Sequence, residues 1–504
     1  MDKSYLLLPV LPCLPLYTVA EDGPALPTAS PNIIVVSFDD MNNWASVLGV
    51  RPGVITPNME RLAARGMVFT NAHCPSPVCN PSRTAIMTGL RAATSGVYSN
   101  AHWWRPAQPD VVTLPGWFRK HGYWTEGAGK VFHHTPGFND PGAWDNYYHW
   151  SPASLANGWQ CGYNEPPDPR PEKEGWPEFV TVHEFDAAPL DVPDEKMPDR
   201  MVADHAAAFL AQKHEKPFFM HVGTFRPHIP LYVPKKYFDL YPADSVALPP
   251  CKADDLDDIS KTALKLTTNQ RTDVHDLVLK TGRWRDAVRA YLASITFADA
   301  QLGVVLDALD KSNYAGNTIV VAWSDHGWHL GEKHRWGKWS LWRCSTQVPL
   351  LVYAPGLTRP GARCARPVNL VDLYPTLAEL AGLPPAPHAE GRSLVPLLCD
   401  PAAEWPWPSL TTFMQGNHSL FGERWHYIRY ADGTGELYDI ESDPDEWNNL
   451  AGRPELDGIR KEMARHLPKT DAAPVPSKSA YKFDPAACTW EKSPPKKTKT
   501  RKPE

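Results

Sequence analysis

Short apolar runs alternate with amphipathic stretches through the first three quarters of the chain. The runs are rich in β-branched residues, as in strands that are buried on both faces of a parallel sheet. They cover residues 32–38, 218–223, 318–323 and 348–353. Residues 56–63 begin like a capped helix with proline in its first turn, and residues 284–309 have a helical period. This alternation predicts an α/β fold with its reactive residues at strand ends.

The pattern changes from about Thr411. Residues 425–430 and 436–440 flank a glycine-rich turn and are typical of a β-hairpin, and a helix is expected from Pro454. We therefore expect a main domain and then a smaller subdomain with an antiparallel sheet, over residues 30–408 and 409–468. The tail at 477–504 is rich in proline and lysine, and we expect it to be disordered because it cannot bury enough apolar surface.

The N-terminus resembles a secretory signal peptide. In residues 1–20, Lys3 precedes a largely apolar run that ends in the small-residue sequence Thr18-Val19-Ala20, although three prolines interrupt the run. This favours a periplasmic or secreted protein. No stretch reaches about 18 uninterrupted apolar residues, so we expect no transmembrane span and no membrane partner.

Composition narrows the class further. The chain has 504 residues, of which 42% are hydrophobic and 21% charged, as in a soluble globular protein. The 51 basic and 57 acidic residues give a net charge of −6, which does not favour a nucleic-acid partner. The nine cysteines lack C-x-x-C spacing, so we expect no thiolate zinc site.

One cysteine lies in a specific motif. Cys79-Asn80-Pro81-Ser82-Arg83 precedes a helix-compatible segment that ends in Thr88-Gly89. A cysteine before a turn proline is often only a buried thiol, but this stretch resembles the sulfatase signature C-x-P-S-R-x-x-x-x-T-G. In that family a maturation enzyme oxidises the cysteine to formylglycine. The hydrate of this aldehyde has two hydroxyls, one to attack sulfur and one to expel sulfate. Asn80 departs from the smaller residues that are more familiar at its position.

Acidic residues follow two of the expected strands. Asp39-Asp40 comes after residues 32–38, and Asp325-His326 comes after residues 318–323. Each pair alone is also typical of a helix cap or loop. Adjacent carboxylates in a partly dehydrated site repel each other unless a cation lies between them. Oxygen ligands with one imidazole favour Ca²⁺ over Mg²⁺. The metal ligands we expect are Asp39, Asp40, Cys79, Asp325 and His326.

The resemblance covers roughly residues 30–468. Further segments look like the ordered signature of the formylglycine-dependent (type I) sulfatases, closest to the iduronate-2-sulfatase-like branch. They are Phe38-Asp39-Asp40, Gly129–His133, Arg226–Pro230, Ser324–Trp328 and Trp336–Lys338. The resemblance implies an alkaline-phosphatase-like α/β core, which is a large mixed, mostly parallel sheet flanked by helices. It also implies the small C-terminal subdomain with an antiparallel sheet.

The resemblance also implies roles for the remaining site residues. Lys130 and Lys338 would hold the sulfate, and His133 would act on the formylglycine hydrate. Arg83 would hydrogen-bond to its hydroxyls. His228 lies between two prolines that fix its direction, so we expect it to be the general acid for the leaving alkoxide.

The substrate contacts are the least defined part of this assignment. Lys130, His228 and Lys338 would bind substrate together with Trp328, which lies within the metal motif. Trp103, Trp104 and Arg105 could line a sugar pocket, although core packing is the usual role of any one tryptophan among 20. His134, next to His133, fits packing or capping equally well.

Three functions remain open at this point. The leading hypothesis is a sulfuric ester hydrolase that acts on a sulfated carbohydrate, such as a 2-O-sulfated uronic acid or related glycan unit. The second is a phosphoester or phosphonate hydrolase of the same superfamily. The third is a catalytically silent glycan-binding protein in which Cys79 stays a thiol.

Overall fold

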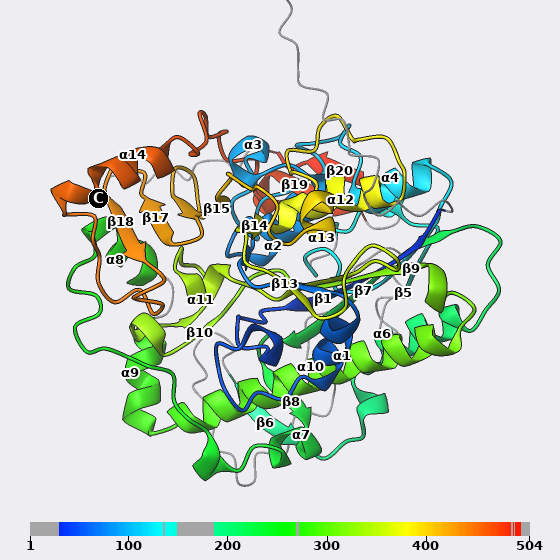
Figure 1. Cartoon of the computed structure of the whole chain (residues 1–504), viewed down its shortest axis with the longest axis horizontal. Coiled ribbons are helices and arrows are strands. Elements are labelled where there is room, and N and C mark those ends of the chain that lie inside the picture. Colours follow the sequence, from blue (N-terminus) through cyan, green and yellow to red (C-terminus); the bar gives the residue numbers. More distant parts are fainter. Residues whose placement is uncertain are drawn as a thin grey trace, which may run out of the picture.

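An eight-stranded mixed sheet runs through the main domain (Figure 1). Five of its seven pairings are parallel, and only β12 pairs antiparallel with its neighbours. The order across the sheet is β13 (Ala362–Cys364), β2 (Met67–Phe69), β12 (Leu350–Tyr353), β9 (Thr318–Ser324), β1 (Asn32–Asp39), β7 (Phe218–Pro227), β4 (Trp124–Gly129) and β5 (Asn146–Tyr148).

This structure is a computed structural model, and it describes residues 30–134, 137–148, 186–268, 272–484, 487 and 489–494. The signal peptide expected at residues 1–20 lies outside the described residues. The four strands expected from the apolar runs are present as β1, β7, β9 and β12.

The four central strands β9, β1, β7 and β4 are mutually parallel. Phe38 in β1 is in register with Ser324 in β9, and Gly129 in β4 is in register with Gly223 in β7. Parallel strands bring their carboxyl ends to one edge of a sheet. The residues that follow these four strands are therefore gathered at one place.

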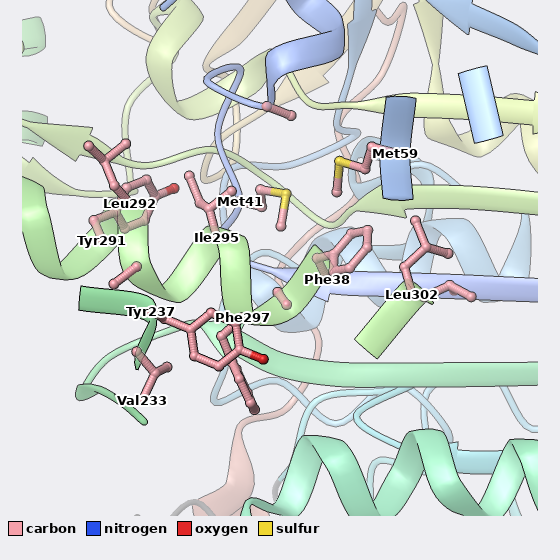
Figure 2. Packing of buried hydrophobic residues seen from close by; sticks show 14 of the residues in the cluster. Phe38, Met41, Met59, Val233, Tyr237, Tyr291, Leu292, Ile295, Phe297 and Leu302 are labelled. Atoms are coloured by element: carbon pink, nitrogen blue, oxygen red, sulfur yellow. The ribbon is translucent and has the colours of Figure 1, made fainter. Parts of the chain in front are cut away.

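Alternate side chains of β1 face two different cores, because successive side chains in a strand point to opposite faces. Phe38 belongs to the core built with α10 (Trp284–Lys311), α6 (Pro198–Leu210) and α1 (Pro57–Arg65). Figure 2 shows Phe38 near Met41, Met59 and Leu302 in this core. Val35 belongs to the opposite core, built with α2 (Cys79–Thr88), α4 (Leu114–Lys120) and α12 (Leu373–Leu380), which lie on the other side of the sheet in Figure 1.

Helix α10 spans the length of the sheet in Figure 1. Among the described residues it is the one helix that is long and apolar enough to cross a membrane. In its most apolar window, 78% of the residues are buried inside the protein. This burial is what a core helix requires.

The C-terminal subdomain has the expected antiparallel sheet. Its strands are β15 (Ser409–Thr412), β16 (His418–Phe421), β17 (Trp425–Arg429) and β18 (Gly435–Asp439). Helix α14 (Asp457–Ala464) covers one face, where Ile459 and Met463 pack against Leu420 and Leu437. The hairpin and the following helix therefore form where the sequence predicts them.

Disorder was expected from residue 477, and for the described part of this tail that expectation is wrong. β19 (Tyr481–Asp484) and β20 (Thr489–Lys492) form a hairpin. Phe483 and Trp490 pack on Trp103, with ring centroids 6.3 and 6.2 Å away. The tail is polar on average, but these two aromatic rings give it enough apolar surface to pack against the main domain. The last residues, from 495, lie outside the described range.

Short elements complete the part of the chain that the structure describes. Two-stranded pairs are formed by β3 (Ala72–His73) with β14 (Val368–Asn369), β6 (Ala187–Leu190) with β8 (Leu231–Pro234), and β10 (His329–Leu330) with β11 (Trp336–Gly337). The remaining helices are α3 (Ala92–Ser95), α7 (Lys235–Asp239), α8 (Lys261–Thr268), α9 (Thr272–Thr281), α11 (Arg343–Thr346) and α13 (Val395–Cys399).

Candidate active site

Four neighbouring strand ends supply the polar side chains of one buried cluster. Asp39 ends β1 and Asp40 follows it, and Asp325 and His326 follow β9. Lys130 follows β4, and His228 follows β7. All six side chains are buried, and His228 is the most exposed at 8%. The sheet thus brings together residues that are up to 287 positions apart in the chain, from Asp39 to His326.

Cys79 is the first residue of α2, directly after the extended residue Val78. Its Sγ accepts a hydrogen bond from Lys338 Nζ at 2.9 Å and lies 3.3 Å from His326 Nε2. Burial raises the pKa of the Cys79 thiol to about 12, although Lys338 acts in the opposite direction. At neutral pH the unmodified thiol is therefore un-ionised, and it is a poor nucleophile.

Arg83, one turn further along α2, ties the strand ends together. Its Nε donates to Asp325 Oδ2 at 2.8 Å, and its other nitrogens donate to the carbonyls of Phe38, Lys130 and Val131. Arg83 is fully buried. Within the described chain its side-chain hydrogen bonds go to these strand ends, and the expected hydrogen bond to the formylglycine hydroxyls stays a prediction. These four acceptors use four of the five N–H donors of the planar guanidinium.

The carboxylates of the cluster are paired with cations. Lys130 Nζ donates to Asp39 Oδ2, and Lys338 Nζ donates to Asp40 Oδ1 at 2.6 Å. Burial raises the pKa of Asp40 to about 6 and that of Asp325 to about 8. Burial acts in the same direction on Asp39, but Lys130 and the other nearby cations outweigh it and hold its pKa well below the usual value.

Two carboxylate oxygens of the cluster lack partners. In the described part of the chain, no hydrogen-bond donor reaches Asp39 Oδ1 or Asp40 Oδ2, although both atoms are buried. A buried carboxylate oxygen without a donor is unfavourable unless a cation approaches it. One ligand atom from each of Asp39, Asp40, Cys79 and His326 lies within 4.8 Å of the others. These residues therefore fit a divalent cation.

Asp325 lies at the edge of this ligand set. Its Oδ1 accepts from the backbone N–H of Asp40 at 3.2 Å, and its Oδ2 lies 3.6 Å from His326 Nε2. The structure therefore brings together all five ligands expected from the sequence, with Asp325 also held by Arg83.

Family models and known proteins match most of the chain. The family model described as Sulfatase matches residues 31–383, and the model described as N-sulphoglucosamine sulphohydrolase, C-terminal, matches residues 331–473. A sulfatase of Formosa agariphila is 37% identical over 471 residues, which cover 90% of this chain and 89% of that protein. Iduronate 2-sulfatase of Mus musculus is 30% identical over 493 residues, which cover 89% of this chain and 84% of that one.

The chain belongs to the sulfatase family. It is a sulfatase enzyme, as the leading hypothesis predicted. A solved structure, the phosphonate monoester hydrolase from Silicibacter pomeroyi, matches with a TM-score of 0.73 at 21% identity, covering 92% of this chain and 99% of that one. This likeness concerns the fold alone. The expected alkaline-phosphatase-like fold, with its mostly parallel sheet, is confirmed.

Three histidines of this sulfatase lie near Lys130 of the cluster. His228 Nε2 lies 3.7 Å from Asp40 Oδ2, and its Nδ1 lies 2.6 Å from the Ile229 carbonyl. Burial, and then Lys130 and Lys338, lower the pKa of His228 well below its usual value. The rings of His133 and His134 are tilted by 34° with centroids 4.2 Å apart, and burial lowers the pKa of both.

Trp328 does not line a sugar pocket, contrary to expectation. Its side chain is 1% exposed and belongs to the core beneath the sheet. Lys338 Nζ lies 5.6 Å from the centre of its ring. A ring without exposed surface cannot stack on a sugar, and Trp328 instead contacts the Lys338 ammonium group.

Sequence reasoning missed Tyr291, which lies in the N-terminal third of α10. Its hydroxyl donates to the Asp40 carbonyl at 2.6 Å and accepts from the Asn42 N–H at 2.9 Å. Asp40 has a φ of 64°, in the left-handed region, and these two hydrogen bonds hold that backbone. No signal in the sequence points to Tyr291, because it is one apolar-face position among many on this helix.

Proposed function

We propose that this sulfatase removes O-sulfate from a sulfated carbohydrate, and that its substrate is a 2-O-sulfated uronic acid or a related glycan unit. The position of Cys79 carries the chemical part of the proposal, at the head of α2 between Lys338 and His326 and beside the unpartnered carboxylate oxygens. Similarity to iduronate 2-sulfatase supports the choice of glycan and of that branch of the family.

The proposal includes formylglycine at position 79, formed by a maturation enzyme, and Ca²⁺ in preference to Mg²⁺. Formylglycine would supply a hydrated aldehyde whose hydroxyl attacks sulfur, a capacity that a thiol of pKa about 12 lacks. Asp39, Asp40, Asp325, His326 and residue 79 would hold the cation. Ca²⁺ accepts a set of hard oxygen ligands with irregular geometry, whereas Mg²⁺ demands a near-ideal octahedron.

The two lysines would then change partners. Lys130 and Lys338 now neutralise Asp39 and Asp40. A divalent cation at these carboxylates would take over that charge, and the two ammonium groups would be left to bind the sulfate oxygens. His133, which burial keeps neutral, would accept a proton from the hydrate. His228 would protonate the leaving alkoxide from its protonated form, which is a minor fraction at neutral pH because burial lowers its pKa.

The decisive experiment measures both the conversion of Cys79 to formylglycine and the release of sulfate. The protein is co-expressed with a formylglycine-generating enzyme, and the peptide that contains position 79 is analysed by mass spectrometry. Sulfate release is then measured on a panel of defined sulfated oligosaccharides. We expect converted cysteine and preferential release from 2-O-sulfated uronic acids. A fully unmodified, inactive protein would refute the enzyme mechanism, and preference for another sulfated position would refute only the substrate.

A phosphonate or phosphoester hydrolase remains the alternative, because the solved phosphonate monoester hydrolase shares the fold over 92% of this chain. Matched aryl sulfate, aryl phosphate and aryl phosphonate substrates decide between them. We expect the converted protein to hydrolyse the sulfate fastest. Faster phosphonate turnover would reverse the assignment. Binding of sulfated glycan by an unconverted, inactive protein would instead favour the glycan-binding hypothesis.

We also propose that the reaction takes place in the periplasm or outside the cell, which rests on the signal-like residues 1–20. N-terminal sequencing of the mature protein from a fractionated culture tests this proposal. A start near residue 21 in the exported fraction is expected.

A further inference from the structure

A second cluster of metal-ligating side chains lies in a separate pocket of this protein. One ligand atom from each of His329, Glu332 and Cys344 lies within 4.8 Å of the others. All three line a cavity of about 500 Å³, which Asn43 and Trp342 also line. The residues around this cavity do not include Asp40, Cys79 or any other ligand of the first cluster.

The hydrogen bonds of His329 leave one ring nitrogen ready to act as a ligand. Ser340 Oγ donates its proton to Ser345 Oγ at 2.8 Å, so it accepts from His329 Nε2, also at 2.8 Å. The Nδ1 atom then carries the lone pair. His329 is fully buried, and within the described residues its Nδ1 has no hydrogen-bond partner. An imidazole whose second nitrogen is fixed by a hydrogen bond is the usual arrangement of a metal-bound histidine.

Asn43 provides an independent observation on the same pocket. Its Nδ2 donates to Gln347 Oε1 at 2.7 Å, which fixes the orientation of the amide. Its Oδ1 is buried, and no donor in the part of the chain that the structure describes reaches it. Two buried acceptors, from Asn43 and His329, therefore lack donors along one cavity wall. Buried acceptors of this kind are normally satisfied by water or an ion.

We propose that His329, Glu332 and Cys344 form a second metal site that binds Zn²⁺. Thiolate, imidazole and carboxylate together suit zinc, whereas the first cluster is dominated by hard oxygen ligands that suit Ca²⁺. Three protein ligands leave a fourth position open to the cavity, for water or a small ligand. Binding of the ion releases the thiol proton of Cys344 to solvent. The absence of C-x-x-C pairs does not exclude such a site, because it uses only one thiolate.

The second site would also fix the residues that build the first. His329 begins β10, and Lys338 follows β11, the partner of β10. A metal bound at His329, Glu332 and Cys344 would clamp the base of this hairpin. It would thereby hold Lys338 in position against Cys79 and Asp40.

Metal titration of the full-length protein tests the site. Co²⁺ replaces Zn²⁺ in such sites, and a thiolate ligand gives it a strong charge-transfer band. The titration uses the Cys79→Ala variant with saturating Ca²⁺. The first cluster then has no thiol, and Ca²⁺ already fills its cation site, so Co²⁺ does not bind there. We expect one equivalent of Co²⁺ with the thiolate band, displaced by one equivalent of Zn²⁺.

Substitution of the ligands then identifies the site. In the same background, Cys344→Ser should abolish the thiolate band, and Glu332→Gln should weaken Zn²⁺ binding by about 10–100-fold while keeping the band. Cys399→Ser is the matched control, because Cys399 is another partly buried free cysteine outside the cluster, and it should leave both readouts unchanged. The proposal fails if the parent shows no thiolate band, or if Cys344→Ser retains the band in a protein with unaltered circular dichroism.

Discussion

Two buried groups of charged side chains in this protein differ in how completely they are hydrogen-bonded. In the cluster around Cys79, Asp39 Oδ1 and Asp40 Oδ2 have no hydrogen-bond donor among the described residues. In the C-terminal subdomain, Glu436 is equally buried, but both of its oxygens are occupied. Tyr430 donates to Oε1, and Trp342 and Tyr438 donate to Oε2, at 2.8–2.9 Å.

The difference separates a binding site from a structural support. Glu436 is stabilised by fixed donors of the protein, so its charge is satisfied without any ligand. The carboxylates at the strand ends are satisfied only in part, and their remaining oxygens suit a cation. Burial alone therefore does not distinguish Asp39 and Asp40 from Glu436, whereas the missing donors do.

The largest expected effect comes from Asp40→Asn. The substitution keeps the shape of the side chain but removes a charged oxygen from the cation site. We expect activity to fall by about 10³-fold, equivalent to several kcal/mol of lost charge stabilisation. We also expect the thermal stabilisation that Ca²⁺ confers on the parent to disappear, because a ligand raises stability only in proportion to its binding.

Glu436→Gln is the matched control for that experiment. It is the same kind of change at a fully buried carboxylate, and the melting temperature of its folded form should still rise with Ca²⁺. If Asp40→Asn keeps both its calcium response and its activity, the distinction between the two groups of carboxylates is wrong.

His228→Ala should have the next largest effect, and one that depends on the leaving group. A general acid contributes about 10²–10⁴-fold for a poor leaving group such as a sugar hydroxyl. It contributes far less for nitrophenol, which needs no proton. Equal losses of kcat/KM on both kinds of substrate would exclude this role for His228.

The pH profile offers a second test of His228. Burial and the nearby lysines lower its pKa well below the usual value of 6.5. Its protonated, acidic form is therefore lost as the pH rises through that lowered pKa. With a sugar sulfate, kcat/KM should already decrease with increasing pH at pH 7, and His228→Ala should remove this dependence.

Glu436→Gln should reduce stability with little change in chemistry. The amide nitrogen would face the N–H of Trp342 or the hydroxyl donors of Tyr430 and Tyr438, so at least one buried donor loses its acceptor. We expect the free energy of unfolding to fall by about 1–3 kcal/mol. Chemical denaturation measures this change, and kcat should stay within about twofold of the parent. A loss of kcat with unchanged stability would mean that Glu436 contributes to the reaction.

The sequence predicted the strand-end cluster well because both of its determinants are local. Apolar runs identify buried parallel strands, and Asp39-Asp40 and Asp325-His326 directly follow them. The topology that makes those strands neighbours brings the ligands together. The burial of Trp328 was not predictable in this way, because it depends on which distant segments of the chain pack against its ring. Tyr291 was equally hidden, since only the tertiary structure places its hydroxyl at the Asp40 carbonyl.

The smallest expected effect concerns Asn80, the unusual residue of the cysteine motif. Its Nδ2 donates to the carbonyls of Ser99 and His102, both at 2.9 Å, and its Oδ1 accepts from Thr84 Oγ1 at 3.1 Å. Like Glu436, it is a satisfied buried group. We expect Asn80→Ala to cost about 1–2 kcal/mol of stability, because two partly buried carbonyls lose their donor.

Conversion of Cys79 should be at least as complete in Asn80→Ala as in the parent, since a small residue at this position matches the more familiar form of the motif. Peptide mass spectrometry after co-expression with the maturation enzyme measures the conversion, and denaturant unfolding measures the stability. Reduced conversion without loss of stability would place Asn80 in recognition by the maturation enzyme. The hydrogen bonds to Ser99 and His102 would then not be the reason for an asparagine at this position. Asn80 would be a recognition residue, unlike Glu436, whose role is structural.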